Sequence, residues 1–466
     1  RSPSGSIPGS CADDATLFQF EMRFSLFCFA ILLVLLLPVE RLHAQDTTRR
    51  GVTIGLTYDP ASRPGIAVLP VTGSSGDSAR VILQRDLDYS DRFTIVPLDA
   101  SDPSSFRGTK PGAELNYPLF SRLGAAAVVQ ATVGDGSLHV ALHDVGRGSV
   151  MNVQDFPLAG RANTKEWRMA VHGVSDEIER WITGLKGMAQ SRVAFVAGQR
   201  IRIVDSDGAD DEVTSVTGNA MSPSWNFAGN QLVYATFGTA SRIMILDLRT
   251  GHSRVLHNAT PSHANLTPVF APDGASIVYS HADDDGSDLY LIAADDGAPR
   301  RISVGRGTDN VQPSFSPDGR RLAFTSGRVG HPEVYIMDAD GTNAELLTSF
   351  DFGDKNYRSD PDWSPDGRLV AFQSQFADGR FQIMTISLRD RSTKLLTSEG
   401  SNEQPSWAPD GRHLVFASTR SGGRELWVLD TESGRLRQLT RAAGAQLPAW
   451  SPRLGSSAST GAASRQ

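Results

Sequence analysis

The sequence predicts a small α/β domain followed by an all-β six-bladed β-propeller, closed by strands from both ends of the repeat region. Three observations support this. Six prolines, each followed two positions later by an aromatic residue, are spaced 45, 45, 48, 44 and 43 residues apart. Pro-Asp-Gly follows four of these pairs, and helical patterns are absent from the region in which they repeat. Repeats of this length, rich in short strands, are typical of propellers with four strands per blade.

Residues 1–44 are expected to precede the folded protein. Met22 and Arg23 are followed by a mostly apolar run at 24–37, and Ala44 comes just before a polar stretch. This order is typical of a secretory signal peptide, with residues 1–21 upstream of a true start at Met22. An uncleaved anchor is the alternative, although the run is short for a membrane span.

Composition excludes several kinds of site. The formal net charge of -7, from 45 basic and 52 acidic residues, provides no overall attraction to nucleic acid or to an anionic membrane. The two cysteines, Cys11 and Cys28, both lie in the signal region. We therefore expect a mature chain without a disulfide, a thiolate nucleophile or a cysteine-ligated metal.

Residues 45–188 predict the α/β domain, because strand and helix patterns alternate there. A helix is expected at 78–90, and a longer one begins near Asn163 and Glu166, carries one apolar face and ends at Gly184. The expected strands are IAVLPV (66–71), FTIVPL (93–98), AAVVQATV (126–133) and LHVALHDV (138–145).

Residues 189–453 predict the propeller. The anchoring pairs are Pro223/Trp225, Pro268/Phe270, Pro313/Phe315, Pro361/Trp363, Pro405/Trp407 and Pro448/Trp450. Three strands precede the first pair without an anchoring strand of their own, and the last pair has no strands after it. Joined, they complete one blade and leave no open sheet edge, which predicts six blades. The small polar tail at 454–466 is expected to be disordered.

No set of residues predicts catalysis or a metal site. The repeated aspartates, Asp273, Asp318, Asp366 and Asp410, fit a turn role, with glycine supplying positive φ. The run at 338–343 departs from a calcium loop and is interpreted as a hairpin; the acidic run at 283–288 is either a solvated loop or a weak cation site. His139 and His143 share a strand pattern, which does not suit zinc.

Binding is therefore the expected function, at the mouth of the central channel. The connections between blades end in polar residues just before the anchoring proline, and the connection at 349–360 is the longest. For the asparagines, turn chemistry is the alternative to a ligand-facing role. Aromatic residues and arginine in a protruding loop are typical of protein interfaces. The candidate partner-binding residues are Asn265, Asn310, Tyr357, Arg358, Asn402 and Gln404.

These features together resemble the TolB family of the Tol-Pal envelope system. The resemblance rests on the Pro-Asp-Gly repeats behind an α/β domain, the helix at 169–187 leading directly into SRVAFV (191–196), and DLDYSDRFTIV (86–96). It extends over nearly all of 45–453. The first blade departs from the pattern, with Asn226-Phe227-Ala228-Gly229-Asn230 in place of Pro-Asp-Gly.

The resemblance implies a periplasmic, non-catalytic adaptor without cofactors, expected to be a monomer, that supports outer-membrane integrity and cell division. In that family the propeller mouth binds the lipoprotein Pal, and the segment after the signal peptide binds the inner-membrane protein TolA. Here that segment is residues 45–54, with Arg49, Arg50, Val52 and Ile54 as its candidate contacts. Its basic and polar character departs from the usual pattern.

Two enzyme classes are the alternatives. A peptidase-associated propeller would need a hydrolase domain, and no residues follow Trp450 that would form one. A polyuronate lyase would need a cluster of metal-binding histidines inside the channel, whereas the ten histidines are scattered along the sequence.

Overall fold

A computed structural model describes residues 62–99, 103–108, 115–238, 240–304, 308–348, 357–441 and 444–455. The statements below concern these residues. The expected signal peptide, the expected TolA-binding segment, most of the long connection at 349–360 and all but the first two residues of the expected tail lie outside them. No helix in the described ranges is both long enough and apolar enough to span a bilayer.

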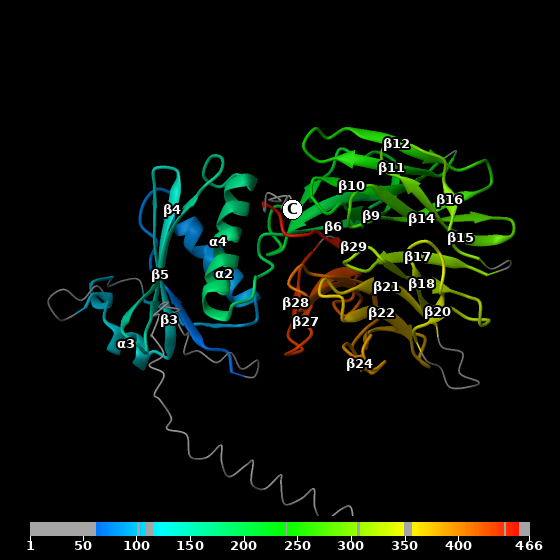
Figure 1. Cartoon of the computed structure of the whole chain (residues 1–466). Coiled ribbons are helices and arrows are strands. Elements are labelled where there is room, and N and C mark those ends of the chain that lie inside the picture. Colours follow the sequence, from blue (N-terminus) through cyan, green and yellow to red (C-terminus); the bar gives the residue numbers. More distant parts are fainter. Residues whose placement is uncertain are drawn as a thin grey trace, which may run out of the picture. The chain divides into compact units, whose positions relative to one another are not determined.

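The N-terminal domain is built on one five-stranded sheet (Figure 1). Its strand order is β2-β1-β3-β4-β5, in which β1 is parallel to β2 and β3 while the other neighbours are antiparallel. The strands are β1 (Gly65–Val68), β2 (Thr94–Ile95), β3 (Ala125–Gly134), β4 (Ser137–Asp144) and β5 (Ser149–Pro157). Sequence patterns missed β5, and only two residues of the strand expected at 93–98 pair with the sheet.

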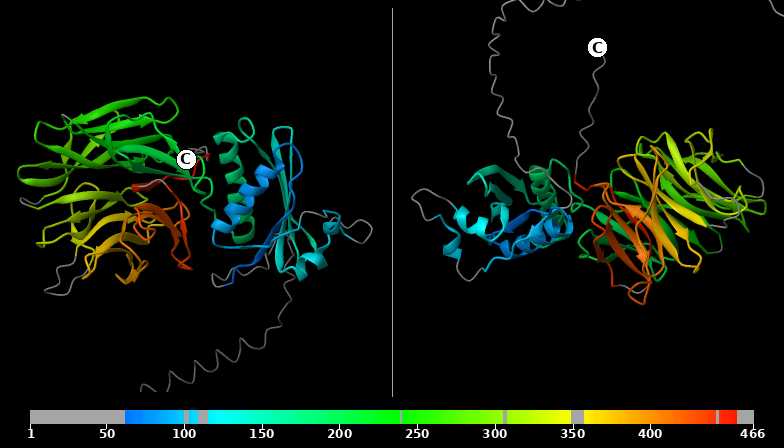
Figure 2. Two further views of the ribbon diagram at one scale, coloured as in Figure 1. Left: turned by 180° about the vertical axis from the view of Figure 1, so that it is seen from behind. Right: turned by 90° about the horizontal axis from the view of Figure 1, so that it is seen from below.

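Two helices, α2 (Gly76–Tyr89) and α4 (Lys165–Thr183), cover one face of this sheet (Figure 2). A 3-10 turn, η2 (Pro103–Phe106), and the short helix α3 (Tyr117–Arg122), which the sequence patterns missed, pack against the other face. The start expected at Asn163 is one residue early, because the Thr164 hydroxyl accepts the hydrogen bond from the Trp167 amide. Gly184, with φ of 76°, ends α4 as expected.

Helix α4 is buried on two sides. Its apolar residues, Trp167, Val171, Val174, Ile178 and Ile182, pack into the core of the sheet domain. A second stripe at helical spacing is polar yet also buried, and it contains His172, Ser175, Asp176 and Glu179. Because an exposed helix face is normally solvated, a buried polar stripe indicates that other polar groups cover it.

The six-bladed propeller predicted from the repeats is confirmed. Blades 1 to 5 each consist of four consecutive antiparallel strands, and blade 6 has the order β29-β6-β7-β8. The last strand of the chain therefore closes the ring beside β6, as expected (Figure 1).

The strands of blade 1 are β9 (Asn219–Trp225), β10 (Gln231–Phe237), β11 (Arg242–Asp247) and β12 (Ser253–Asn258). Blade 2 has β13 (Ala264–Phe270), β14 (Ser276–Asp283), β15 (Gly286–Ala293) and β16 (Arg300–Arg301), and blade 3 has β17 (Asn310–Phe315), β18 (Arg321–Ser326), β19 (Glu333–Asp338) and β20 (Glu345–Leu346). Blade 4 has β21 (Arg358–Trp363), β22 (Leu369–Gln375), β23 (Phe381–Ser387) and β24 (Thr393–Leu395). Blade 5 has β25 (Asn402–Trp407), β26 (His413–Ser418), β27 (Glu425–Asp430) and β28 (Leu436–Gln438). Blade 6 has β29 (Gln446–Trp450), β6 (Arg192–Ala197), β7 (Arg200–Asp205) and β8 (Glu212–Val213).

A bulge recurs in the innermost strand of every blade. The residue before the anchoring proline has positive φ in all six: Ser222, Thr267, Gln312, Asp360, Gln404 and Leu447. The ladder shifts register at the same place in each blade. In three cases the side chain at this position accepts a hydrogen bond from the backbone amide of its counterpart in the next blade, namely Thr267 from Gln312, Gln312 from Asp360, and Gln404 from Leu447. The bulge thus links neighbouring blades.

The anchoring aromatic residues pack at the seams between blades. The Trp407 indole donates to the Asp362 carbonyl of blade 4 at 3.1 Å, and the Trp225 indole donates to the Ala449 carbonyl of blade 6 at 2.9 Å. Both rings are buried in the cores formed with the neighbouring blade. Trp407 therefore fills the space between blades 4 and 5.

Candidate functional site

The propeller has two distinct faces. Because the strands of each blade alternate in direction, the connections between blades and the turns between second and third strands lie at one end. Ser287, at the start of β15 just after the β14–β15 turn, pairs with Asp309 in the next connection, which confirms that these segments meet. We call this end the mouth face. The Pro-Asp-Gly turns and the turns between third and fourth strands form the opposite end, which we call the turn face.

Three of the six residues expected at the mouth are fully buried. The Asn310 carbonyl oxygen accepts from Ser326 and Arg328, while its amide donates to Asp288 of blade 2. In blade 5 the same positions recur: the Asn402 oxygen accepts from Ser418 and Arg420, and its amide donates to Gln382 of blade 4. These asparagines join one blade to the next.

Asn265 occupies the same position in blade 2. Its side-chain oxygen lies 2.7 Å from Nδ1 of His281, and the residue is fully buried. Since none of the three asparagines presents its side chain to solvent, their expected role as partner contacts is corrected to a structural one. Turn and strand-start chemistry, the alternative considered for them, is closer to their observed role.

Arg358 and Gln404 also have partners within the propeller. The Arg358 guanidinium lies 3.1 Å from both carboxylate oxygens of Glu333, which is fully buried, and 15% of the Arg358 side chain is exposed. The Gln404 side chain accepts from the Leu447 amide at 2.8 Å. Both residues therefore order the wall of the mouth, because their polar groups are occupied by neighbouring blades.

Tyr357 is the expected mouth residue that does present an exposed side chain. It is 41% exposed and makes an edge-on contact with Phe381 at 5.5 Å between ring centroids. Phe376, in the β22–β23 turn of the same blade, is 42% exposed. The exposed apolar side chains Val304, Val329 and Met221 also belong to the mouth face. We call Tyr357, Phe376, Val329, Val304 and Met221 the mouth apolar set.

Sequence reasoning missed four members of this set. It searched for polar residues that recur at one position of the repeat, whereas Phe376, Val329 and Val304 stand in irregular turns and connections, and Met221 lies in β9. Phe376 in QFADGR and Val329 in GRVGH are apolar residues in turns otherwise rich in glycine and polar groups. That contrast was the available signal, because several exposed apolar side chains on one face of a protein are typical of an interaction site.

Two carboxyl groups near the inner bulge have raised pKa values. Burial raises the pKa of Asp360 to about 7, and the negative charge of Glu403 in blade 5 adds to the effect. Burial also raises the pKa of Asp362 to about 6, against hydrogen bonds from the Trp407 amide and the Ser314 hydroxyl. The inner wall of blade 4 is therefore only partly charged at neutral pH.

The turn face of blades 5 and 6 contacts the N-terminal domain through two groups of buried charges. The first, which we call the His172 cluster, contains Asp86 of α2, Arg168 and His172 of α4, and Asp205 and Asp207 of blade 6. His172 Nδ1 lies 2.8 Å from Asp86, and its Nε2 lies 3.7 Å from Asp205. Arg168 bridges Asp205 and Asp207 at 3.1 and 3.0 Å.

The second group, which we call the His413 cluster, is centred on the Pro-Asp-Gly turn of blade 5. His413 Nδ1 lies 2.6 Å from Asp410, and its Nε2 lies 3.3 Å from Asp91, which follows α2. Arg412 pairs with buried Asp430 and donates to the Asp91 carbonyl. Arg435 pairs with Asp91 at 2.9 Å and with Asp88 at 3.1 Å.

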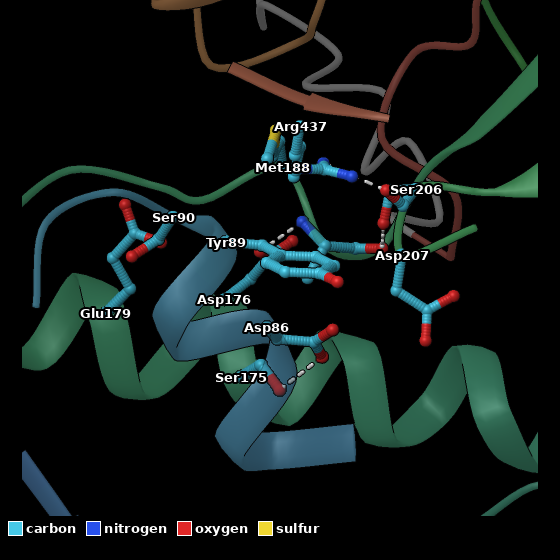
Figure 3. Close-up of a pocket in the computed structure, with 11 residues that line it drawn as sticks. Asp86, Tyr89, Ser90, Ser175, Asp176, Glu179, Met188, Ser206, Asp207 and Arg437 are labelled. Carbon is cyan, nitrogen blue, oxygen red and sulfur yellow. Dashed lines mark hydrogen bonds between the residues drawn. The ribbon is translucent and has the colours of Figure 1, made fainter. Parts of the chain in front are cut away.

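A small polar cavity of about 10 Å³ lies at the same contact, among Asp86, Tyr89, Asp176, Asp207 and Arg437 (Figure 3). Its volume suits about one water molecule. Arg437 donates to the Ser206 carbonyl and stacks on the Tyr89 ring, with 4.3 Å from the guanidinium carbon to the ring centroid. Asp176 accepts from the amides of Ala189 and Gln190, which orders the segment between the domains.

These clusters suit ion pairing better than metal binding or catalysis. Among the residues that the structure describes, the two groups whose carboxylate and histidine atoms converge closely enough for a metal are Asp86/His172/Asp207 and Asp91/His413/Asp430. Asp207 and Asp430 already bind arginine guanidinium groups. Both ring nitrogens of His172 and of His413 face carboxylates, so neither ring offers a free nitrogen as a general base. Sequence reasoning missed both clusters because their members are far apart in the chain.

The comparison with protein families identifies the propeller part of the chain. A family model described as "TolB beta propeller domain" matches residues 179–454, which include all six blades. The Tol-Pal system protein TolB of Xanthomonas oryzae is 29% identical over 250 residues, covering 49% of this chain and 54% of the relative. TolB of Pasteurella multocida is 29% identical over 253 residues, covering 49% and 55%. The chain thus spans about half the length of the curated relatives it matches.

The similarity of fold to a solved structure extends beyond the propeller. The crystal structure of TolB from Acinetobacter baumannii superposes with a TM-score of 0.71 at 23% sequence identity. The match covers 85% of this chain and 98% of that one, and so includes the N-terminal domain as well as the propeller.

Proposed function

The chain belongs to the TolB β-propeller family, and on that premise we propose that it is a non-catalytic periplasmic adaptor of the Tol-Pal envelope system. The propeller mouth binds a Pal-type outer-membrane lipoprotein, and residues 45–54 bind a TolA-type inner-membrane protein. Through these contacts the protein supports outer-membrane integrity and cell division. The main support for partner binding at the mouth is the mouth apolar set.

The physical basis of this proposal is the contrast between the rim of the mouth and its wall. The wall residues Asn310, Asn402 and Arg358 are occupied by bonds within the propeller, so they hold a fixed shape. Tyr357 and Phe376 extend from that wall with more than a third of each side chain exposed. Rigid aromatic anchors on a preformed surface lose little conformational freedom on binding, which favours protein recognition.

The test compares aromatic residues on the two faces. We expect Tyr357→Ala and Phe376→Ala each to weaken binding of the soluble domain of a Pal-type lipoprotein by about tenfold or more, as is typical of interface anchors. The matched control is Phe227→Ala, because Phe227 is 68% exposed but belongs to the β9–β10 turn on the turn face. The dissociation constant is measured by isothermal titration calorimetry. Unchanged binding by both mouth variants, or an equal loss in the control, contradicts the mouth assignment.

The two binding events are separated by deleting residues 45–54. We expect loss of TolA-type binding with Pal-type binding kept or strengthened. Loss of neither event overturns the N-terminal assignment.

A capture experiment distinguishes the adaptor from the enzyme alternatives. The mature protein is used to recover partners from envelope extract, and recovery of an outer-membrane lipoprotein supports the adaptor. Absence of any partner, together with turnover of a polyuronate, overturns it. In the part of the chain that the structure describes, the two groups in which histidine and carboxylate atoms converge closely enough for a metal lie against the N-terminal domain and not in the channel, which supports the adaptor over the lyase.

A further inference from the structure

We propose that the His172 and His413 clusters form an electrostatic latch, which holds the N-terminal domain against the turn face of blades 5 and 6 and releases it when either cluster loses its charge balance. This inference is independent of the proposed partners. It rests on the position of the two clusters, on their composition and on the small cavity between them.

Both clusters join residues that are far apart in the chain. In the first, His172 of α4 stands between Asp86 of α2 and Asp205 of blade 6. In the second, His413 of blade 5 faces Asp91, which lies beyond the end of α2. Because α2 contributes to one cluster and the residues just after it contribute to the other, the helix is held at two separate points. Two points of attachment resist rotation of the domain, which one point would allow.

Charge balance within each cluster depends on the histidine. Through shared ion pairs the His172 cluster also includes Arg85, Lys165, Arg192, Asp210 and Glu212. Its carboxylates are then Asp86, Asp205, Asp207, Asp210 and Glu212, and its cations other than the ring are Arg85, Lys165, Arg168 and Arg192. Around His413, the groups are Asp88, Asp91, Asp410, Asp430 and Glu432 against Arg412 and Arg435. Removing one member of a buried pair leaves an uncompensated charge, which is strongly destabilising. Each histidine is therefore the group whose loss opens its cluster.

The region between the two clusters holds the cavity of about 10 Å³, whose lining includes polar side chains of both domains together with Tyr89 and Met188. Arg437 is held there by its stacking on Tyr89 and by the Ser206 carbonyl. Domains of one chain move relative to one another unless the contact between them is large and apolar, so we expect the charges to affect whether these two domains stay together.

The pKa values agree in direction with this geometry. Burial alone would lower the pKa of His172, but the charge of Asp86, its hydrogen bond to Nδ1 and the nearby Asp205 carboxylate raise it to about 10. Burial likewise disfavours the charged form of His413, while Asp410, Asp91 and Asp430 raise its pKa to about 9. Both rings are therefore charged at neutral pH, and raising the pH removes the charge.

The experiment measures the distance between the domains. Cys11 and Cys28 are replaced by serine, and spin labels are attached to cysteines introduced at exposed Asp135 in the β3–β4 turn and exposed Asp284 in blade 2. Pulsed electron resonance then reports the distribution of distances between the two labels. We expect one narrow distribution for the otherwise unchanged chain at pH 7. His172→Gln and His413→Gln are each expected to broaden it at least twofold, and raising the pH to 10.5 is expected to do the same without a substitution.

Two sets of further variants keep the outcome interpretable. Arg85→Gln and Arg435→Gln remove partly exposed members of each cluster, so they test the latch even where a histidine variant fails to fold. His139→Gln is the matched control, because His139 pairs with Asp155 on the exposed surface of the sheet domain. A narrow distribution in all four cluster variants and at pH 10.5 overturns the latch. Broadening in His139→Gln equal to that in the cluster variants also overturns it.

Discussion

The Pro-Asp-Gly turn of blade 5 and the equivalent turn of blade 4 have nearly the same sequence but different surroundings. Both read Pro-Asp-Gly-Arg, and the two glycines have φ values of 69° and 75°. In each turn the aspartate accepts a hydrogen bond from the amide of the following arginine, at 3.0 Å. The local structure is therefore the same, and turn chemistry explains it in both blades.

The surroundings of the two arginines differ. Arg368 of blade 4 has 82% of its side chain exposed and pairs with Asp366 of its own turn. Arg412 of blade 5 has 3% exposed and pairs with buried Asp430. Docking of the N-terminal domain covers one turn and leaves the other in solvent. One repeated motif thus serves as a turn in blade 4 and as a turn plus an ionic contact in blade 5.

The largest expected effect comes from the arginines. Arg412→Met leaves Asp430 buried without its main partner and is expected to lower the free energy of unfolding by about 3–5 kcal/mol. Arg368→Met, the matched change on the surface, is expected to cost about 0–1 kcal/mol. Denaturant titration of both variants measures the difference. Similar losses in the two variants would show that burial does not distinguish the turns.

The second-largest expected effect is on the pH dependence of stability, which should reflect the buried turn of blade 5. The pKa of His413 is raised to about 9 in the folded protein, above its ordinary value near 6.5. Its contribution to stability is therefore complete below pH 6.5 and is lost as the pH rises toward 9, at up to about 1.4 kcal/mol per pH unit. The gap in unfolding free energy between the unchanged chain and His413→Gln should shrink across this window. The measurement is denaturant unfolding at pH 6, 7.5 and 9.

His139→Gln is the control for this series, since His139 lies on the surface. The free energy of unfolding of this variant, measured at the same three pH values, is the reference for the series. A gap between the unchanged chain and His413→Gln that does not shrink from pH 6 to pH 9 would contradict the assignment of charge to the buried ring.

The smallest expected effect concerns the anchoring tryptophans of the same two blades. The Trp407 indole donates to the Asp362 carbonyl, whereas the Trp363 indole has no hydrogen-bond partner. Trp407→Phe is expected to cost about 1 kcal/mol more than Trp363→Phe, the value of one net hydrogen bond. Thermal unfolding of both variants measures this. An equal cost would mean that ring packing alone holds the two seams.

Much of the fold was predictable from the sequence because the repeat provides the same signal several times. Spacing of the anchoring pairs predicted six blades and the closure of blade 6, which β29 and β6 confirm. Elements that occur once and have a weak sequence pattern were harder to predict. Strand β5 was missed because its exposure follows no strict alternation, and the start of α4 was displaced by one residue because Asn163 and Thr164 are both capping residues.

The candidate sites were less predictable. The repeat drew attention to Asn265, Asn310 and Asn402, and repetition proved to mark residues that hold blades together. Tyr357 and Phe376 are exposed because the turns that carry them extend from the ring. The pattern of residues along the sequence does not show which turns extend in this way.

By itself, the sequence determined most of the elements, the number of blades and the closure of the ring, because turn geometry and strand periodicity act over a few residues at a time. Tertiary structure alone decided which of two similar turns became an ionic contact. His172 with Asp205, and His413 with Asp91, are brought together by the folding of segments far apart in the chain. Their charges interact strongly only because the N-terminal domain excludes water from around them.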